Sequence, residues 1–114
     1  MTDPIHHLAE AHHWEDAQRT GRYERSTLGL SLADEGFIHL STDAQWAGVL
    51  QRYYRDVEGD LVLLTVDPDL LDPSTELRWE APGPGSDELF PHLYGPLPTS
   101  AVTATRVLHP PHGA

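Results

Sequence analysis

The segment from Leu61 to Val66, Leu-Val-Leu-Leu-Thr-Val, constrains the fold of this chain more than any other. Successive side chains of a β-strand point to opposite faces of a sheet, and this segment is apolar on both faces. A strand of this kind needs apolar cover on both sides. The segment therefore predicts the central strand of a sheet.

Two helices are predicted from the spacing of apolar side chains. Residues 11–20 place apolar side chains on one helix face and are followed by Gly21, which favours a helix end. In residues 43–55, apolar side chains recur at i, i+3, i+4 and i+7, and Thr42 with Gln45 fits a capping box. We therefore expect helices over 11–20 and from about 43 to 55.

The remaining segments complete an α+β pattern, in which strands and helices alternate only in the first half. We expect strands over 5–8, 36–41, 77–80 and 102–108, a polar connection over 21–30, a loop over 81–87 and a flexible tail over 109–114. A chain of 114 residues has the size of one domain with one hydrophobic core. We place that single domain at residues 1–108.

The composition and the apolar segments limit the cellular location and the kinds of site that we expect. The chain has no cysteine, which rules out disulfides, thiolate metal ligands and a cysteine nucleophile. The N-terminal residues lack the basic and apolar regions of a signal peptide, and no apolar run reaches the roughly 18 residues of a membrane span. We expect a cytoplasmic protein without a membrane partner.

The balance of charged residues limits the kinds of ligand that we expect the chain to bind. Eighteen acidic residues against seven arginines and no lysine give a formal net charge of −11. Such a field repels polyanions, and this disfavours general nucleic-acid binding, which needs a basic face. A local arginine can still hold one small phosphorylated ligand.

The segment Phe37-Ile38-His39-Leu40-Ser41-Thr42 carries the first group of polar residues with chemical potential. A strand repeat of two places Phe37, His39 and Ser41 on one face, so that an imidazole and a hydroxyl project side by side. Such a pair can hydrogen-bond a ribose or an amide, next to the N-terminus of the following helix. The alternative is a buried histidine tied to backbone, with Ser41 or Thr42 capping that helix.

A second group lies in Phe90-Pro91-His92-Leu93-Tyr94-Gly95-Pro96. His92 and Tyr94 are two residues apart and share a side if the segment is extended, and the prolines stiffen it. The alternative is a rigid connection whose aromatic side chains belong to the core. We predict that His39, Ser41, His92 and Tyr94 line one pocket.

Charged residues in the neighbouring strand have two interpretations. Arg78 and Glu80 share one face of the predicted strand, and such a pair is most often a surface ion pair of little energy. If that face borders a cleft, Arg78 can clamp a phosphate or carboxylate, and Glu80 can polarise a hydroxyl. Glu80 and Glu88 are the carboxylates to consider for catalysis.

The histidine pairs His6-His7 and His12-His13 raise the alternative of a metal site and a metal-dependent hydrolase. Adjacent histidines on a strand point to opposite faces, and no His-Glu-x-x-His motif accompanies them. We therefore predict no bound transition metal.

Taken together, these segments resemble a bacterial family known as domain of unknown function 952. The resemblance rests on Ile5-His6-His7-Leu8, Trp14, Gly21-Arg22-Tyr23, Glu35-Gly36-Phe37-Ile38-His39-Leu40-Ser41-Thr42, Leu61-Val62-Leu63-Leu64, Leu77-Arg78-Trp79-Glu80 and Leu89-Phe90-Pro91-His92-Leu93-Tyr94-Gly95-Pro96-Leu97. It covers nearly the whole chain.

More distantly, the chain is similar to the ADP-ribosyltransferase-like superfamily, in particular the RNA 2′-phosphotransferases. Ile38-His39-Leu40-Ser41 matches their Val-His-Leu-Ser strand, Leu61 to Asp67 matches an apolar strand that closes with Asp, and His7-Leu8-Ala9 takes the place of His-Gly-Thr. Asp34 and Glu35 stand where those enzymes carry basic side chains, which disfavours transfer of an RNA 2′-phosphate.

This resemblance implies an α+β fold with a split, curved β-sheet and two main helices, whose cleft holds NAD. It implies that His7 and His39 orient the ribose, that Ser41 contacts the amide, and that Tyr94 or Trp79 stacks on a ring. The expected catalytic residues are His39, His92 and Glu80, and the expected cofactor-binding residues are His7, Ser41, Thr42, Arg78, Trp79 and Tyr94.

The function expected from the sequence is binding of NAD or a related nucleotide, with transfer of ADP-ribose to a small acceptor or cleavage of the nicotinamide glycosidic bond. The alternatives are a non-catalytic module that senses a nucleotide or another small ligand, and a metal-dependent hydrolase.

Overall fold

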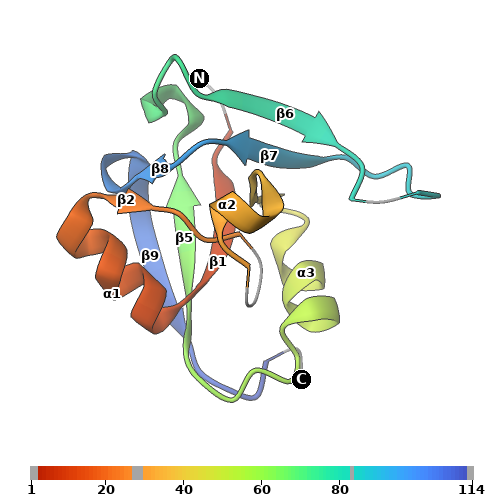
Figure 1. Ribbon diagram of the computed structural model, residues 1–114. Coiled ribbons are helices and arrows are strands. Elements are labelled where there is room, and N and C mark those ends of the chain that lie inside the picture. The colour runs from red at the N-terminus through yellow and green to blue at the C-terminus, as the bar shows by residue number, and fades with distance from the viewer. Residues whose placement is uncertain (1–2, 27–29, 83, 113–114) are drawn as a thin grey trace.

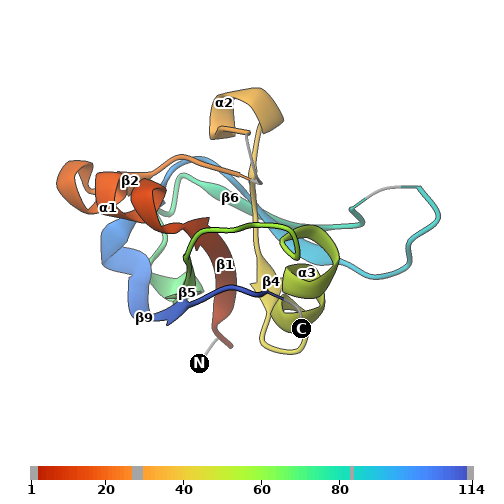
Figure 2. The same ribbon diagram turned by 90° about the horizontal axis from the view of Figure 1, so that it is seen from below.

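The predicted central strand is β5 (Leu61–Val66), which pairs antiparallel with β1 (Ile5–Glu10) on one side and β9 (Val102–Leu108) on the other. β4 (Ser41–Thr42) adds to β1 and completes a four-stranded sheet in the order β4-β1-β5-β9. Figures 1 and 2 show the strands of this sheet in the computed structural model, which describes residues 3–26, 30–82 and 84–112.

Both faces of β5 are buried, as the apolar segment predicts. Val62, Leu64 and Val66 belong to one hydrophobic cluster, and Leu61 and Leu63 belong to a second cluster on the opposite face. The first cluster includes residues of α1 (Ala11–Thr20), and the second includes residues of α3 (Trp46–Tyr53). Figures 1 and 2 place these two helices on opposite sides of β1.

A second layer of short strands runs crosswise to β1 and β5 (Figure 1). β3 (Ile38–His39), β7 (Phe90–Tyr94) and β6 (Glu76–Glu80) form a three-stranded antiparallel sheet in the order β3-β7-β6. β2 (Arg22–Tyr23) and β8 (Leu97–Pro98) form a separate two-stranded ladder. The connection between β6 and β7 contains the predicted loop 81–87 and extends away from the body of the domain.

The single strand predicted over 36–41 is divided between the two larger sheets. Ile38 and His39 pair with β7, whereas Ser41 pairs with His6 of β1. Leu40, which is 1% exposed, lies between the two short strands and donates its amide N–H to Pro91 O. The prediction that Ser41 continues the face of His39 is therefore wrong, because the chain changes sheets at Leu40.

Glycines and a side-chain hydrogen bond set the ends of the helices. Gly21 follows α1 with φ of 85°, a conformation that favours glycine, and this confirms the predicted helix end. α3 begins later than predicted, because the Gln45 side chain accepts a hydrogen bond from the amide of Thr42 and holds the preceding residues in a turn. The sequence did not predict the short helix α2 (Leu32–Glu35), which ends at Gly36.

Two 3-10 turns flank the central sheet, and the chain end packs against the domain. η1 (Pro68–Leu70) follows β5, and η2 (Thr99–Ala101) precedes β9. In the segment predicted as a flexible tail, His112 is buried and donates to Gly59 O, and His109 contacts Asp60, so this part packs against the domain. Within the described part of the chain, no helix is long and apolar enough to cross a bilayer.

Candidate functional site

A cavity of about 390 Å³ lies where α3 faces the three-stranded sheet, and we call it the His39 pocket. Its wall combines aromatic, charged and imidazole side chains from four segments. The residues are Glu35, Phe37 and His39 beside and in β3; Val49, Arg52, Tyr53 and Tyr54 in and after α3; Pro82, Ser86 and Glu88 in the β6–β7 connection; and Phe90 and His92 in β7. The predicted loop therefore borders the cavity.

Three side chains form a hydrogen-bonded series that ends at this pocket, the Glu80–His92–His39 relay. Nδ1 of His39 lies 3.1 Å from Nε2 of His92, and Nδ1 of His92 lies 2.9 Å from Oε1 of Glu80. The Tyr94 hydroxyl donates to the same carboxylate oxygen. Antiparallel pairing brings the groups together, because His39 lies opposite His92 in the β3–β7 ladder and Glu80 lies on the adjacent strand β6.

The carboxylate fixes the position of each proton in the relay. An ionised Glu80 only accepts hydrogen bonds, so His92 donates its Nδ1–H, and a neutral His92 keeps a lone pair on Nε2. His39 must then donate its own Nδ1–H to His92, which leaves the lone pair of His39 on Nε2. His39 thus presents a hydrogen-bond acceptor on the ring nitrogen that the relay does not use.

The electrostatic surroundings hold the relay in this protonation state. Burial, followed by the neighbouring His92 and His7, lowers the pKa of His39 to about 4. The hydrogen bond from Tyr94, followed by that from His92, lowers the pKa of Glu80. At neutral pH the pocket therefore contains a neutral imidazole supported by an anionic carboxylate.

His7 supports the pocket from behind and does not line it. Its side chain is 2% exposed, its Nδ1–H donates to the carbonyl oxygen of His39 at 2.6 Å, and its Nε2 accepts from the Tyr23 hydroxyl at 2.9 Å. Both ring nitrogens are therefore occupied by protein partners. The predicted contact of His7 with a ribose would require these bonds to break.

Stability is expected to fall as the pH drops from about 6.5 to 4.5. Burial lowers the pKa of His7 to about 4, as it does for His39, so over this range the unfolded chain binds protons that the folded chain excludes. For His7 the loss approaches roughly 3 kcal/mol at low pH, at about 1.4 kcal/mol per pKa unit. Melting curves between pH 7 and 4.5 measure this loss of stability, and the same curves on His109→Ala serve as the control. A melting temperature independent of pH over this range would contradict the burial of neutral imidazoles.

The other residues expected to bind a cofactor lie outside the pocket. Ser41 is buried in β4, and the amide of Thr42 is bonded to Gln45. Trp79 is 48% exposed. None of these three side chains lines the cavity.

Arg78 and Tyr94 border the relay without lining the cavity. Arg78 pairs with Glu76 at 2.7 Å, and its guanidinium lies 4.7 Å from the centre of the Tyr94 ring. Tyr94 joins the site through its bond to Glu80 and through its ring, whose centre lies 5.4 Å from that of Phe37. Of the four side chains predicted to line one pocket, His39 and His92 do so.

Sequence reasoning missed several residues of the pocket wall. The Phe37 ring stacks on His92 with 4.1 Å between ring centres, and Arg52 and Tyr53 come from the end of α3. For Phe37 the strand repeat predicts only that its side chain lies on the side of His39. No comparable signal marks Arg52 and Tyr53, because their position depends on how α3 packs against the sheet.

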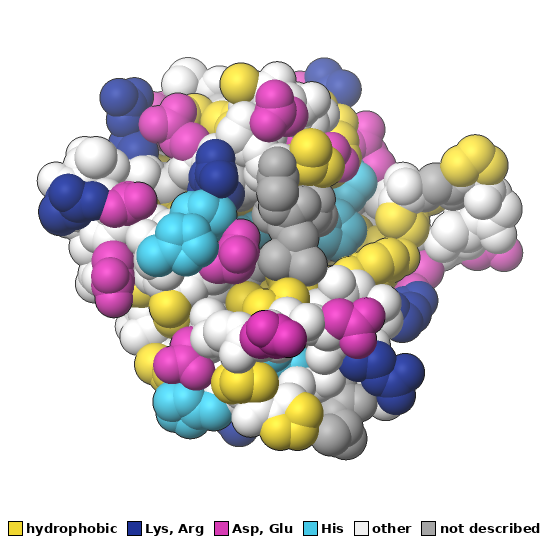
Figure 3. Space-filling model, turned by 60° about the horizontal axis from the view of Figure 1, so that its bottom comes forward, with side chains coloured by type: hydrophobic (Ala, Val, Ile, Leu, Met, Phe, Trp, Pro, Cys, Tyr) yellow, Lys and Arg dark blue, Asp and Glu magenta, His cyan; other side chains and the backbone are white. Residues whose placement is uncertain are grey.

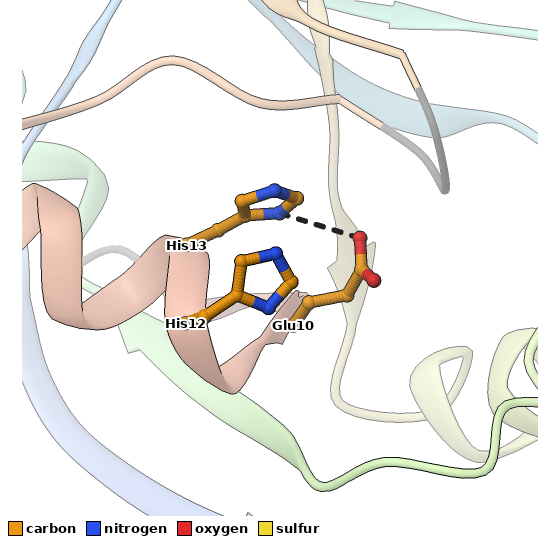
Figure 4. Close-up of side chains that lie close together, drawn as sticks. All are labelled: Glu10, His12 and His13. Atoms are coloured by element: carbon orange, nitrogen blue, oxygen red, sulfur yellow. Dashed lines mark ion pairs between the residues drawn. The ribbon is translucent and has the colours of Figure 1, made fainter.

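The side chains of the two histidine pairs are arranged differently. As expected for adjacent residues on a strand, His7 contacts Tyr23 while His6 Nε2 lies 3.2 Å from Asp43. His12 and His13, however, lie in the first turn of α1 and converge with Glu10 (Figure 4). The argument that none of the histidine pairs converges is therefore wrong for His12-His13.

Comparison with known proteins places the chain in a family. The crystal structure of protein CC0527 from Caulobacter crescentus is similar with a TM-score of 0.75 and 34% sequence identity, over 92% of this chain and 85% of that chain. A double mutant of CC0527 matches with the same TM-score and coverage and 33% identity. No curated protein matches the chain. The family model described as "Protein of unknown function (DUF952)" matches residues 8–105, and the chain therefore belongs to the DUF952 family.

Proposed function

We propose that the His39 pocket binds a nucleotide such as NAD, and that the domain is a variant of the ADP-ribosyltransferase-like fold. The observation that carries the proposal is the Glu80–His92–His39 relay, which leaves a neutral acceptor nitrogen on a residue of the cavity wall. A ribose hydroxyl or an amide N–H is a suitable donor to that nitrogen. The division into a four-stranded and a three-stranded sheet supports the proposed split sheet.

The remaining wall of the pocket suits the other parts of such a ligand. Phe37, Tyr53 and Phe90 offer aromatic faces against which a flat ring can stack. Arg52 offers one guanidinium for a phosphate in a chain whose net charge is −11. Figure 3 shows acidic side chains spread over the face drawn there, which fits a single bound nucleotide better than a polyanion.

The chemistry proposed at this site is cleavage of the bond between nicotinamide and ribose. The bonding electron pair leaves with nicotinamide, and an acceptor hydroxyl or water attacks the ribose carbon. His39 Nε2 takes the proton of that nucleophile, and the relay spreads the resulting positive charge toward Glu80. The carboxylates of Glu35 and Glu88, which also line the pocket, stabilise the positive charge that develops on the ribose.

A second possibility is a binding module that senses a nucleotide without turning it over. The observation in its favour is that the Glu80 carboxylate already accepts hydrogen bonds from both His92 and Tyr94. A carboxylate held in this way stabilises the relay and is not free to contact a ligand. Turnover of NAD separates the two possibilities.

Calorimetric titration of the purified protein with NAD, ADP-ribose and nicotinamide tests the proposal. We expect one NAD to bind per chain, and we expect the melting temperature to rise with NAD concentration because the ligand binds only the folded state. Chromatography of the same mixtures detects released nicotinamide, which indicates catalysis, whereas binding without release indicates sensing. Absence of binding by all three ligands would contradict the proposed nucleotide site.

A further inference from the structure

We propose that Glu10, His12 and His13 bind a divalent transition-metal ion at a site separate from the His39 pocket. One ligand atom from each residue lies within 4.8 Å of the other two. Nδ1 of His13 lies 3.3 Å from Oε2 of Glu10, and the His12 and His13 ring centres are 4.0 Å apart. Figure 4 shows the three side chains gathered at the junction of β1 and α1.

The junction of strand and helix explains this convergence. Glu10 is the last residue of β1, and α1 begins at the next residue, so no loop separates Glu10 from the two histidines. The amide of Ala11 donates to Asp60 O at 3.2 Å and fixes the turn. In a continuing strand His12 and His13 would point to opposite faces, but the change to helical geometry brings them to the same side as Glu10.

The donor set indicates the class of ion. Two imidazole nitrogens and one carboxylate oxygen suit zinc and neighbouring divalent ions, which they hold at about 2.0–2.2 Å. Donors arranged tetrahedrally at that distance lie roughly 3.4 Å apart, close to the 3.3 Å between His13 and Glu10. The exposed His12 ring is free to turn toward the same ion. Three protein ligands leave at least one coordination position for water.

Arg25 competes with a metal ion for His13. Its Nη2 lies 3.0 Å from Nε2 of His13, so it donates to that nitrogen while Nδ1–H of His13 donates to Glu10. Metal binding through Nδ1 releases that proton, requires Nε2 to carry one, and requires the guanidinium to turn away. His12 and His13 border a cavity of about 350 Å³, which gives the metal access to the site.

Titration with zinc chloride tests this site, using protein from which any polyhistidine tag has been removed. We expect one zinc per chain with micromolar affinity, measured by calorimetry and by competition with a chromogenic chelator. His12→Asn and Glu10→Gln should each weaken zinc binding by about tenfold or more, since loss of a residue that only hydrogen-bonds to a metal ligand already costs about tenfold to a hundredfold. His109→Asn is the matched control, because His109 also contacts a carboxylate, that of Asp60, at the surface.

The exposed position of His12 keeps this test independent of folding. Circular dichroism should show unchanged folding for His12→Asn, and weakened zinc binding in that variant then supports the site. Absence of stoichiometric zinc binding by the unmodified chain would overturn the proposal. Binding that is unchanged in both site variants, or that is lost in the His109 variant, would also overturn it.

Discussion

His39→Ala is expected to weaken NAD binding by about tenfold to more than a hundredfold, while the melting temperature changes little. Loss of a hydrogen bond from a ligand to a partly buried polar group is worth roughly 1.5–3 kcal/mol, which corresponds to that range. The backbone carbonyl of His39 still accepts from His7 in the variant, so the bond that fixes β3 remains. Water in the pocket can replace His39 as the partner of His92.

Calorimetric titration with NAD and melting curves, each on His39→Ala and on the unmodified chain, measure these two effects. Trp79→Ala is a suitable control, because Trp79 is exposed on the same sheet and does not line the pocket. If His39 instead serves the core, the variant should melt at a much lower temperature and bind NAD as before. That combination would remove His39 from the proposed site.

His7→Ala is expected to lower the free energy of unfolding by about 3–5 kcal/mol and the melting temperature by more than about 10 °C. The change removes a fully buried ring and leaves the Tyr23 hydroxyl and the His39 carbonyl without their partners. Both the cavity and the orphaned polar groups contribute to the loss. Thermal and urea unfolding followed by circular dichroism measure it.

Tyr23→Phe provides the matched comparison for His7. It keeps the aromatic ring in the core and removes only the hydroxyl that donates to His7, so we expect a loss of about 1–2 kcal/mol. If His7→Ala melts at the same temperature as the unmodified chain, the His7 ring does not join β1 to β3.

The parts of the fold that the sequence predicts are those with a long local pattern. β5, α1 and β9 each carry a pattern of six or more residues, and their positions agree with the predictions. The ladders of β3 and β4 are two residues long, and their partners are far along the chain in β7 and β1. No local period determines where such short strands pair, which is why the break at Leu40 could not be predicted.

The same distinction applies to the candidate site. Strand parity placed His92 with Tyr94 and placed Phe37 with His39, and the β3–β7 ladder then brings His39 and His92 together. The convergence of Glu10 with the two histidines of α1 could not be foreseen from parity, because the parity of a strand ends where the helix begins.

The change of sheets at Leu40 also determines where this domain can accept inserted residues. His39 and Ser41 each serve a different sheet, so a single inserted residue would turn one of their side chains to the opposite face. The β6–β7 connection, in contrast, extends from the body of the domain and borders the pocket without joining the two larger sheets. Insertions in that connection can reshape the pocket entrance and leave the relay intact, so ligand preference can diverge between relatives there while residues 38–42 keep a fixed length.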